Sequence, residues 1–282
     1  MAEAPPVPPL PEGLAARVAA IERGFSGTVA LWFTDLRERR TFGLRAAQRF
    51  DPASTIKLFI LRELYRQSGA GLLSLEETRT MGPYDVVPGS GVLKDLTPGS
   101  VALTLHDLAT LMVTVSDNVA TNLLIGRLSA GAVNRGARDA GFQDTFLRGK
   151  LFKAKTRRSH TTAQDLGTLM TQIARRQAVS REASNGMLRI LRREQSDYIV
   201  GRFLPYTKEE LEADVKPWKI ASKSGSIRGH RHDVALVEGH GRRYVLALMS
   251  SGAKDLRFWP DNEGTLALAQ IARAVHDEVT CR

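Results

Sequence analysis

The chain has 282 residues, of which 43% are hydrophobic and 25% are charged, and its formal net charge is +10. This composition predicts one large globular domain or two closely packed lobes; the charge would suit nucleic acid, an acidic surface, an anionic substrate, or simply a basic soluble protein. Cys281 is the single cysteine, which excludes an intramolecular disulfide and a thiolate metal site. No apolar run reaches the roughly 18 residues of a transmembrane helix.

Residues 1–11 contain five prolines and no apolar core of the kind that a signal peptide needs, and they predict a flexible leader. A mature chain whose signal had been removed would look the same. Residues 14–23 then predict a short amphipathic helix. Alternating β-prone residues over 27–36, answered by 41–44 across a charged turn, predict a hairpin at the start of a sheet.

Residues 51–58 predict a turn that runs into a buried helix, and residues 69–100, rich in Gly, Pro and Ser, predict a long irregular connection. Further helices are expected over residues 105–115, 119–128, 132–140, 162–175 and 181–193. Near the C-terminus, β-prone segments at 218–222, 234–238 and 244–250 predict a three-strand meander, followed by an amphipathic helix over 265–279.

Strands at both ends of the chain with helices between them predict an α/β fold, arranged as an α+β sandwich. An antiparallel sheet would form from the N- and C-terminal strands, with flanking helices and an inserted all-helical lobe. We expect a single catalytic unit over residues 12–282, with an α/β lobe (12–53 plus 216–282) and a helical lobe (54–215).

Ser54 and Lys57 stand three residues apart at the start of the first buried helix, which places them on one helix face. A buried amine has a lowered pKa and can take a proton from a nearby hydroxyl, so this pair is a candidate nucleophile and base. First-turn backbone N–H groups would favour an oxyanion at the same place. The alternative is an ordinary helix start whose lysine reaches solvent.

A second polar group, Ser116-Asp117-Asn118, interrupts two apolar helical segments. A turn there would push the Ser116 hydroxyl and the Asn118 amide into a cleft. The alternative is a simple helix break with Ser116 or Asp117 as the cap.

A third group, Lys223-Ser224-Gly225, lies on a predicted strand. Strand alternation puts Lys223 and Gly225 on one face, and a glycine allows another backbone to approach closely. The alternative is a strand end with a solvated lysine.

Together, Ser-x-x-Lys, Ser-Asp-Asn and Lys-Ser-Gly form the motif set of class A β-lactamases and penicillin-binding proteins. From about residue 12 to its end, the chain resembles the class A β-lactamase family of penicillin-recognising serine hydrolases. Trp218 before the third motif, residues 120–124 after the second, and Thr161-Thr162 at the next helix support the resemblance.

The resemblance implies four catalytic residues. Ser54 attacks the amide carbonyl, and Lys57 is the acylation base or part of its proton relay. Ser116 passes a proton to the leaving nitrogen, and Lys223 lowers the pKa around Ser116 and attracts a substrate carboxylate.

The resemblance also implies a substrate-binding set. Asn118 binds the substrate side-chain amide and steadies Lys57, and Ser224 hydrogen-bonds the carboxylate. Gly225 belongs to the same strand, and the backbone N–H groups of Ser54 and Ser226 form the oxyanion hole. Either Arg228 or Arg231 is a candidate for a second charge facing the carboxylate.

The chain departs from the family where an omega-shaped loop normally supplies a glutamate that activates the deacylating water. Residues 144–160 contain no Glu or Asn, and residues 148–158 include six cations and no acid. A general base contributes roughly 10²- to 10⁴-fold, so we expect slow deacylation. His160 is a possible substitute base, and the basic segment is either a solvated rim or a polyanion-binding surface.

We therefore predict a β-lactamase-like serine hydrolase that acts through a Ser54 acyl-enzyme. A D-Ala-D-Ala carboxypeptidase, penicillin-binding protein or esterase on the same scaffold is the alternative. The second alternative is a non-catalytic penicillin or wall-fragment sensor, and the third is an anion-binding surface protein.

We expect a small-molecule β-lactam or a cell-wall peptide as substrate, no nucleic-acid partner, no membrane span, and a monomer. No cofactor and no metal is implied, although two nearby histidines, His230 and His232, leave a metal site as a weaker hypothesis. The family implies the periplasm or the cell exterior, whereas the sequence as given has no signal peptide.

Overall fold

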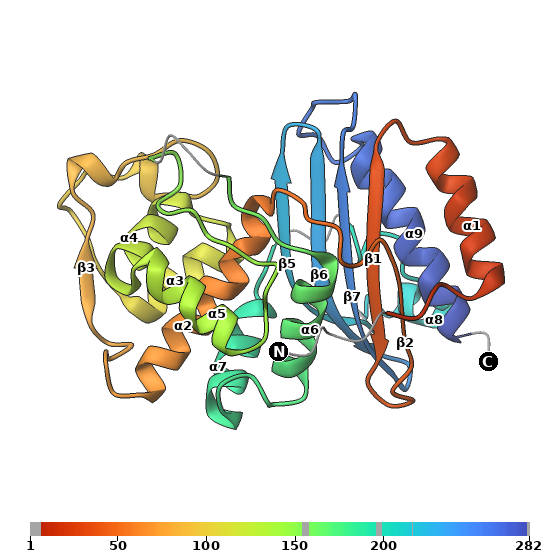
Figure 1. The fold of residues 1–282 in the computed structure, drawn as a ribbon, viewed down its shortest axis with the longest axis horizontal. Coiled ribbons are helices and arrows are strands. Elements are labelled where there is room, and N and C mark those ends of the chain that lie inside the picture. Colours follow the sequence, from red (N-terminus) through yellow and green to blue (C-terminus); the bar gives the residue numbers. More distant parts are fainter. Residues whose placement is uncertain (1–6, 154–157, 196–198, 216, 281–282) are drawn as a thin grey trace.

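A five-stranded antiparallel sheet, in the order β2-β1-β7-β6-β5, is the backbone of one half of the molecule. The computed structural model describes residues 7–153, 158–195, 199–215 and 217–280. The strands are β1 (Thr28–Asp35), β2 (Thr41–Leu44), β5 (Lys219–Ile227), β6 (His230–Gly239) and β7 (Arg242–Ser251). The predicted sheet from both chain ends is thus confirmed, and β5 lies at its edge, facing the helices (Figure 1).

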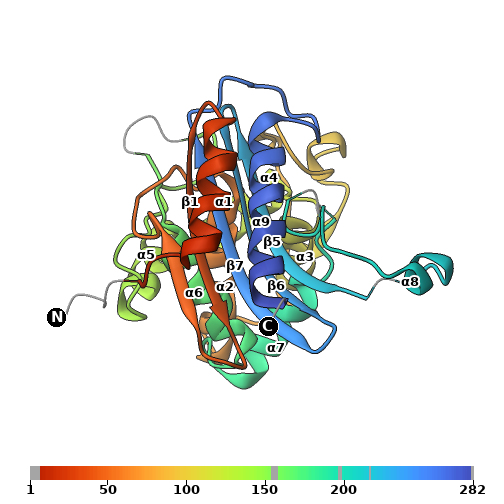
Figure 2. The ribbon, with the colours of Figure 1, turned by 90° about the vertical axis from the view of Figure 1, so that its right-hand side faces the viewer.

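The sheet is covered by helices on both faces. On the outer face lie α1 (Glu12–Arg23) and α9 (Glu263–Thr280), side by side in Figure 2. On the inner face, α6 (Ala163–Ala174) contacts β1, β6 and β7. The alternation of β1 explains this sandwich, because Leu31 and Phe33 join the outer core whereas Trp32 joins the inner one.

The other half of the molecule is a group of helices around α2 (Lys57–Gly69), most of whose side chains are buried. Its neighbours are α3 (Leu105–Thr114), α4 (Asn118–Leu128), α5 (Ala130–Asp139) and α7 (Arg181–Leu191). These helices and the inner face of the sheet share one continuous hydrophobic cluster. The start of α2 is therefore held between the two halves, next to β5.

Three short elements were not predicted from the sequence. β3 (Thr78–Thr80) pairs with β4 (Ala102–Thr104) inside the segment expected to be irregular, and α8 (Lys208–Glu212) stands out from the body in Figure 2. They are largely exposed, so they lack the apolar periodicity on which sequence reading depends. Strand β5 runs to Ile227, so Lys223-Ser224-Gly225 lies on a strand, as the sequence predicted. Among the residues described, no helix is long and apolar enough to cross a bilayer.

Candidate active site

Ser54 lies in a single 3-10 turn, Ala53–Ile56, which runs directly into α2 and contacts β5 and β6. The chain just before it is fixed by His232, whose Nε2 donates to the Asp51 carbonyl oxygen at 2.8 Å while Nδ1 accepts from the Ser250 amide. Burial lowers the pKa of His232 to about 3, so the ring stays neutral and can keep both roles. The position of Ser54 is thus set by the sheet.

Lys57, three residues after Ser54, is completely buried. Its Nζ lies 2.7 Å from the Ser116 carbonyl oxygen, 3.0 Å from Ser116 Oγ and 2.9 Å from Asn118 Oδ1. The Ser54 hydroxyl receives none of these hydrogen bonds. Burial first, and then the positive charge of Lys223, hold the pKa of Lys57 well below 10.5. The amine is therefore shifted toward a neutral form that can accept a proton.

The Ser116-Asp117-Asn118 turn joins α3 to α4. Ser116 has a left-handed backbone, with φ of 54°, which directs both of its oxygens toward Lys57. Asp117 caps α4 by accepting from the Ala120 amide at 2.9 Å. The cap that the sequence allowed as a purely structural alternative therefore exists, and the same turn also presents Ser116 and Asn118 to the buried amine.

The segment 88–93 braces this turn from outside. Asp117 Oδ2 accepts from the amides of Val92 and Leu93 at 2.7 and 2.9 Å, and Asn118 Nδ2 donates to the Pro88 carbonyl at 3.0 Å. A Cβ at Gly91 would lie 2.3 Å from the Asp117 carboxylate, so this close approach requires glycine. Part of the long connection therefore supports the site.

Lys223, also fully buried, is paired with Glu194, an acid that the sequence analysis did not single out. Glu194 Oε1 accepts from Lys223 Nζ at 3.0 Å and from Ser224 Oγ and N at 2.6 and 3.2 Å, and Oε2 accepts from Ser222 Oγ at 2.7 Å. The Glu194 side chain is 2% exposed. Burial alone would raise its pKa, but the Lys223 charge and the serine hydrogen bonds outweigh burial and lower it.

A weak signal for Glu194 exists in the sequence. Between Glu182 and Glu209 the sequence has only two acids, Glu194 and Asp197. If this stretch supplies the counter-ion of Lys223, it has to be one of these two. Which of them reaches β5 depends on how the chain leaves α7, and that is a tertiary property.

Gly225 brings the edge strand against the backbone of the Ser54 turn. A Cβ at Gly225 would lie 3.0 Å from the amide nitrogens of both Ser54 and Thr55. The Ser224 amide points away from β6, toward Glu194, and amides two residues apart on a strand point the same way, so the Ser226 N–H also faces the open edge. Two amides suited to an oxyanion thus lie on adjoining segments.

The two arginines proposed for a second charge differ in position. Arg231 is buried and donates to the carbonyls of Ile227, His230 and Arg257, so its guanidinium is already engaged, while Arg228 is exposed. His230 and His232 are neighbours, yet no group of three or more possible metal ligands occurs among the described residues. The ring of the substitute-base candidate His160 stacks on Phe146.

The loop after α5 lies against α4. Asn122, one turn after Asn118, donates to the Leu151 carbonyl at 3.1 Å and accepts from the Leu151 amide at 2.6 Å. This double hydrogen bond places Leu151 beside the row of polar side chains on α4. Of the basic segment, residues 154–157 lie outside the described residues.

The two acids that bracket this loop are both engaged. Asp144 pairs with Arg49 at 2.6 Å, and Asp165 accepts from Thr145 Oγ1 at 2.8 Å. Burial raises the pKa of Asp165 to about 6. Neither acid contacts the Ser54, Lys57 or Ser116 group.

Comparisons with known proteins agree with this arrangement. A model of the beta-lactamase enzyme family matches residues 13–279. A beta-lactamase from Rhodobacter capsulatus is 27% identical over 94% of this chain and 87% of its own length. The crystal structure of a beta-lactamase from Sphaerobacter thermophilus is 30% identical, with a TM-score of 0.84 over 96% of this chain and 98% of that one. PBP-A is 29% identical, with a TM-score of 0.85 over 99% and 100% of the two chains.

The buried pair of Glu194 and Lys223 makes stability depend on pH. Since folding lowers the pKa of Glu194 below 4.5, its stabilisation is complete above that value and is lost as the pH falls through the folded-state pKa. Glu194→Gln should lower the free energy of unfolding by about 3 kcal/mol at pH 7, and the difference should shrink below pH 4.5. Urea titrations at several pH values measure this. Glu76→Gln, the same change at an exposed site, should have little effect; an equal loss in both variants would contradict the assignment.

Proposed function

The chain belongs to the beta-lactamase enzyme family, and from this membership we propose that it opens β-lactams through an acyl-enzyme on Ser54 and releases the acyl group slowly. As a member, it is a serine hydrolase that acts on β-lactam amide bonds. The observation that supports the assignment of Ser54 is the buried amine of Lys57, held between Ser116 and Asn118 one turn further on.

Acylation would proceed in two proton-balanced steps. The neutral amine of Lys57 takes the Ser54 proton as Oγ bonds to the carbonyl carbon, and the Ser54 and Ser226 amides stabilise the oxyanion. When the carbon–nitrogen bond breaks, the leaving nitrogen takes the Ser116 hydroxyl proton. Lys57, 3.0 Å from Ser116 Oγ, returns a proton to that hydroxyl and becomes neutral again.

Lys223 would supply a positive charge near Ser116 and the substrate carboxylate. The negative charge of Glu194, which is paired with Lys223, partly cancels this positive field. The Ser224 hydroxyl, also a proposed ligand of the substrate carboxylate, donates a hydrogen bond to Glu194 at 2.6 Å. A substrate carboxylate therefore has to compete with, or displace, an internal carboxylate. This competition favours substrates whose binding depends on more than that one charge.

Slow release of the acyl group follows from the loop that lies on α4. Residues 145–160 contain no acid, and the residue whose backbone Asn122 holds is Leu151. A leucine cannot take a proton from water. Hydrolysis of the acyl-enzyme therefore lacks the rate acceleration of roughly 10²- to 10⁴-fold that a general base provides.

The missing base keeps a second function in view, that of a D-Ala-D-Ala carboxypeptidase or penicillin-binding protein. PBP-A, similar over nearly the whole chain, has a mutant solved as an acyl-enzyme complex with penicillin G. A sensor that binds without turnover is the remaining alternative. A panel of esters and D-Ala-D-Ala peptides separates the two, because any Ser54-dependent turnover excludes the sensor.

One prediction of this proposed function concerns the covalent intermediate. Intact-protein mass spectrometry after mixing with penicillin G should show one acyl adduct that persists for minutes or longer, since deacylation lacks its base. Ser54→Ala should show none. Absence of an adduct on the unaltered chain at every time point would refute Ser54 as the nucleophile.

A second prediction concerns pH. Acylation needs the neutral form of Lys57, whose pKa lies well below 10.5 because of burial and the nearby charge of Lys223. The acylation rate constant for a chromogenic cephalosporin should therefore rise with pH and level off before the pH reaches 10.5. Stopped-flow measurements from pH 5 to 10 test this. A rate that falls as pH rises through this range would contradict proton transfer to Lys57.

A third prediction restores the missing base. Leu151→Glu should speed deacylation by at least tenfold, toward the roughly 10²- to 10⁴-fold contribution of a general base, while acylation changes little. The lifetime of the penicillin adduct measures this. Phe152→Glu is the matched control, because its side chain is 61% exposed and an acid there adds the same charge one residue away. Equal acceleration by both variants would argue against a base at position 151.

A further inference from the structure

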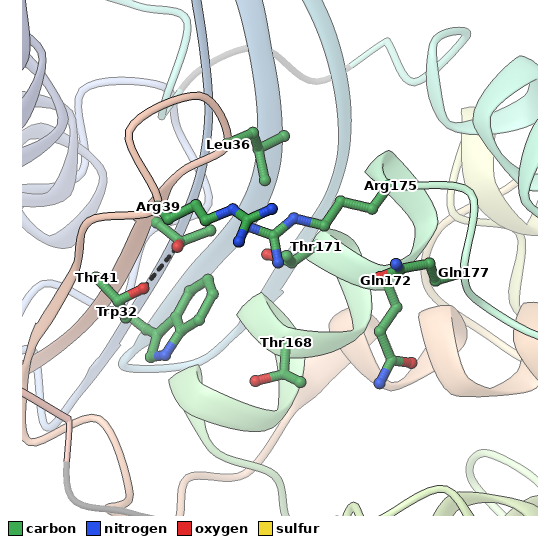
Figure 3. Close-up of a pocket in the computed structure, with 10 residues that line it drawn as sticks. Trp32, Leu36, Arg39, Thr41, Thr168, Thr171, Gln172, Arg175 and Gln177 are labelled. Carbon is green, nitrogen blue, oxygen red and sulfur yellow. Dashed lines mark hydrogen bonds between the residues drawn. The ribbon is translucent and has the colours of Figure 1, made fainter.

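A cavity of about 490 Å³ lies between the β1–β2 hairpin and the C-terminal half of α6 (Figure 3). None of the candidate active-site residues lines it. In the sheet, β1 is separated from the active-site strand β5 by β7 and β6. The residues that line the cavity are Trp32, Thr34, Leu36, Arg39, Thr41, Thr168, Thr171, Gln172, Arg175 and Gln177.

The only charged residues of the lining are two arginines, one from each side of the cavity. Arg39 comes from the hairpin and Arg175 follows α6, and in Figure 3 their guanidinium groups extend toward each other. Among the residues that the structure describes, neither guanidinium has a hydrogen-bond or ion-pair partner. Two like charges brought together without a counter-ion repel each other, and an anion between them removes that repulsion.

The nearby acids are engaged elsewhere. The Asp35 carboxylate is buried and accepts from the amides of Arg37 and Glu38 at 2.7 and 2.8 Å. The Glu38 carboxylate lies 3.6 Å from the Arg242 guanidinium. The cavity therefore has positive charge on its rim and no acid in its lining.

An independent sign of a missing ligand is the hydroxyl of Thr171, which lines the same cavity. The Thr171 side chain is 9% exposed, and its Oγ1 has no hydrogen-bond partner among the described residues. Buried polar atoms in native proteins are nearly always paired, because an unpaired one loses its hydration without compensation. Thr171 lines the same cavity as Arg39 and Arg175, so its hydroxyl is a candidate donor to an oxyanion held by the two guanidinium groups.

The rest of the lining suits a larger molecule than a bare ion. Gln172, Gln177 and Thr168 offer neutral donors and acceptors on the α6 side, and the indole of Trp32 forms an apolar wall. The volume of about 490 Å³ falls within the range of small-molecule sites.

We propose that this cavity binds a doubly charged oxyanion of the phosphate class, either inorganic phosphate or the phosphate group of a monoester. The two guanidinium forks match the charge and the several oxygens of such a group, and the Thr171 hydroxyl supplies a further donor. The proposal goes beyond the hydrolase activity and does not depend on it.

Isothermal titration of the full chain with inorganic phosphate and with glycerol phosphate, at constant ionic strength set with sodium chloride, tests the proposal. Saturable binding of at least one of them at one site per chain is expected. Equal affinities for the two ligands would show that the cavity recognises the phosphate group alone. Tighter binding of the monoester would show that the neutral residues of the lining also contact the ligand.

Arg39→Gln and Arg175→Gln should each weaken binding about tenfold or more, as expected for loss of a charged hydrogen-bond partner. Arg37→Gln, the same change on an exposed hairpin residue outside the lining, should retain affinity.

Thr171→Val provides a second readout. It should weaken phosphate binding while leaving the melting temperature of the free protein unchanged or higher, because it removes an unpaired buried hydroxyl. Cephalosporin hydrolysis or acylation should be unchanged in Arg39→Gln and Arg175→Gln, so failure at this cavity is distinguishable from failure of the hydrolase assignment. No phosphate binding beyond that of chloride, or binding that survives in both arginine variants, would overturn the proposal.

Discussion

The buried amine of Lys57 constrains much of the structure around it. In its protonated form an amine shielded from water needs three acceptors, and here they are two oxygens of Ser116 and one of Asn118. To supply them, the turn between α3 and α4 has to lie over the start of α2 with Ser116 in a left-handed conformation. Asp117 holds this turn from the α4 side and the segment 88–93 holds it from outside.

The second buried amine changes the electrostatics of the first. Lys223 lowers the pKa of Lys57 by repulsion, whereas Glu194 and Asp117 act in the opposite direction. Glu194 is therefore more than the counter-ion of Lys223, because its charge also limits how far the Lys57 pKa falls. It achieves both by occupying the edge of β5, where it accepts from Ser222 and Ser224 as well. The edge of β5 thus carries an internal carboxylate at the place where we expect a substrate carboxylate to bind.

The net charge of +10 is compatible with several classes of partner. The positions of individual arginines reduce the number of these classes. Most described cations on the helical side are paired or lie at the surface. Arg39 and Arg175 are exposed as well, but they also face each other across a cavity that holds an unpaired hydroxyl. The composition could indicate an excess of positive charge, but only the packing of α6 against β1 brings two of those charges to one place.

The sequence alone determined the sheet from both chain ends, most of the helices, and the three motifs with Ser54, Lys57, Ser116 and Lys223. These depend on short-range patterns, namely apolar periodicity and fixed spacing within a turn or a strand. It could not reveal β3, β4 and α8, which bury too little apolar surface to leave a pattern. Only tertiary structure decided that Glu194 reaches Lys223 and that Leu151 rests on Asn122. Each of these contacts joins residues 29 positions apart in the chain, and their meeting depends on how the elements pack.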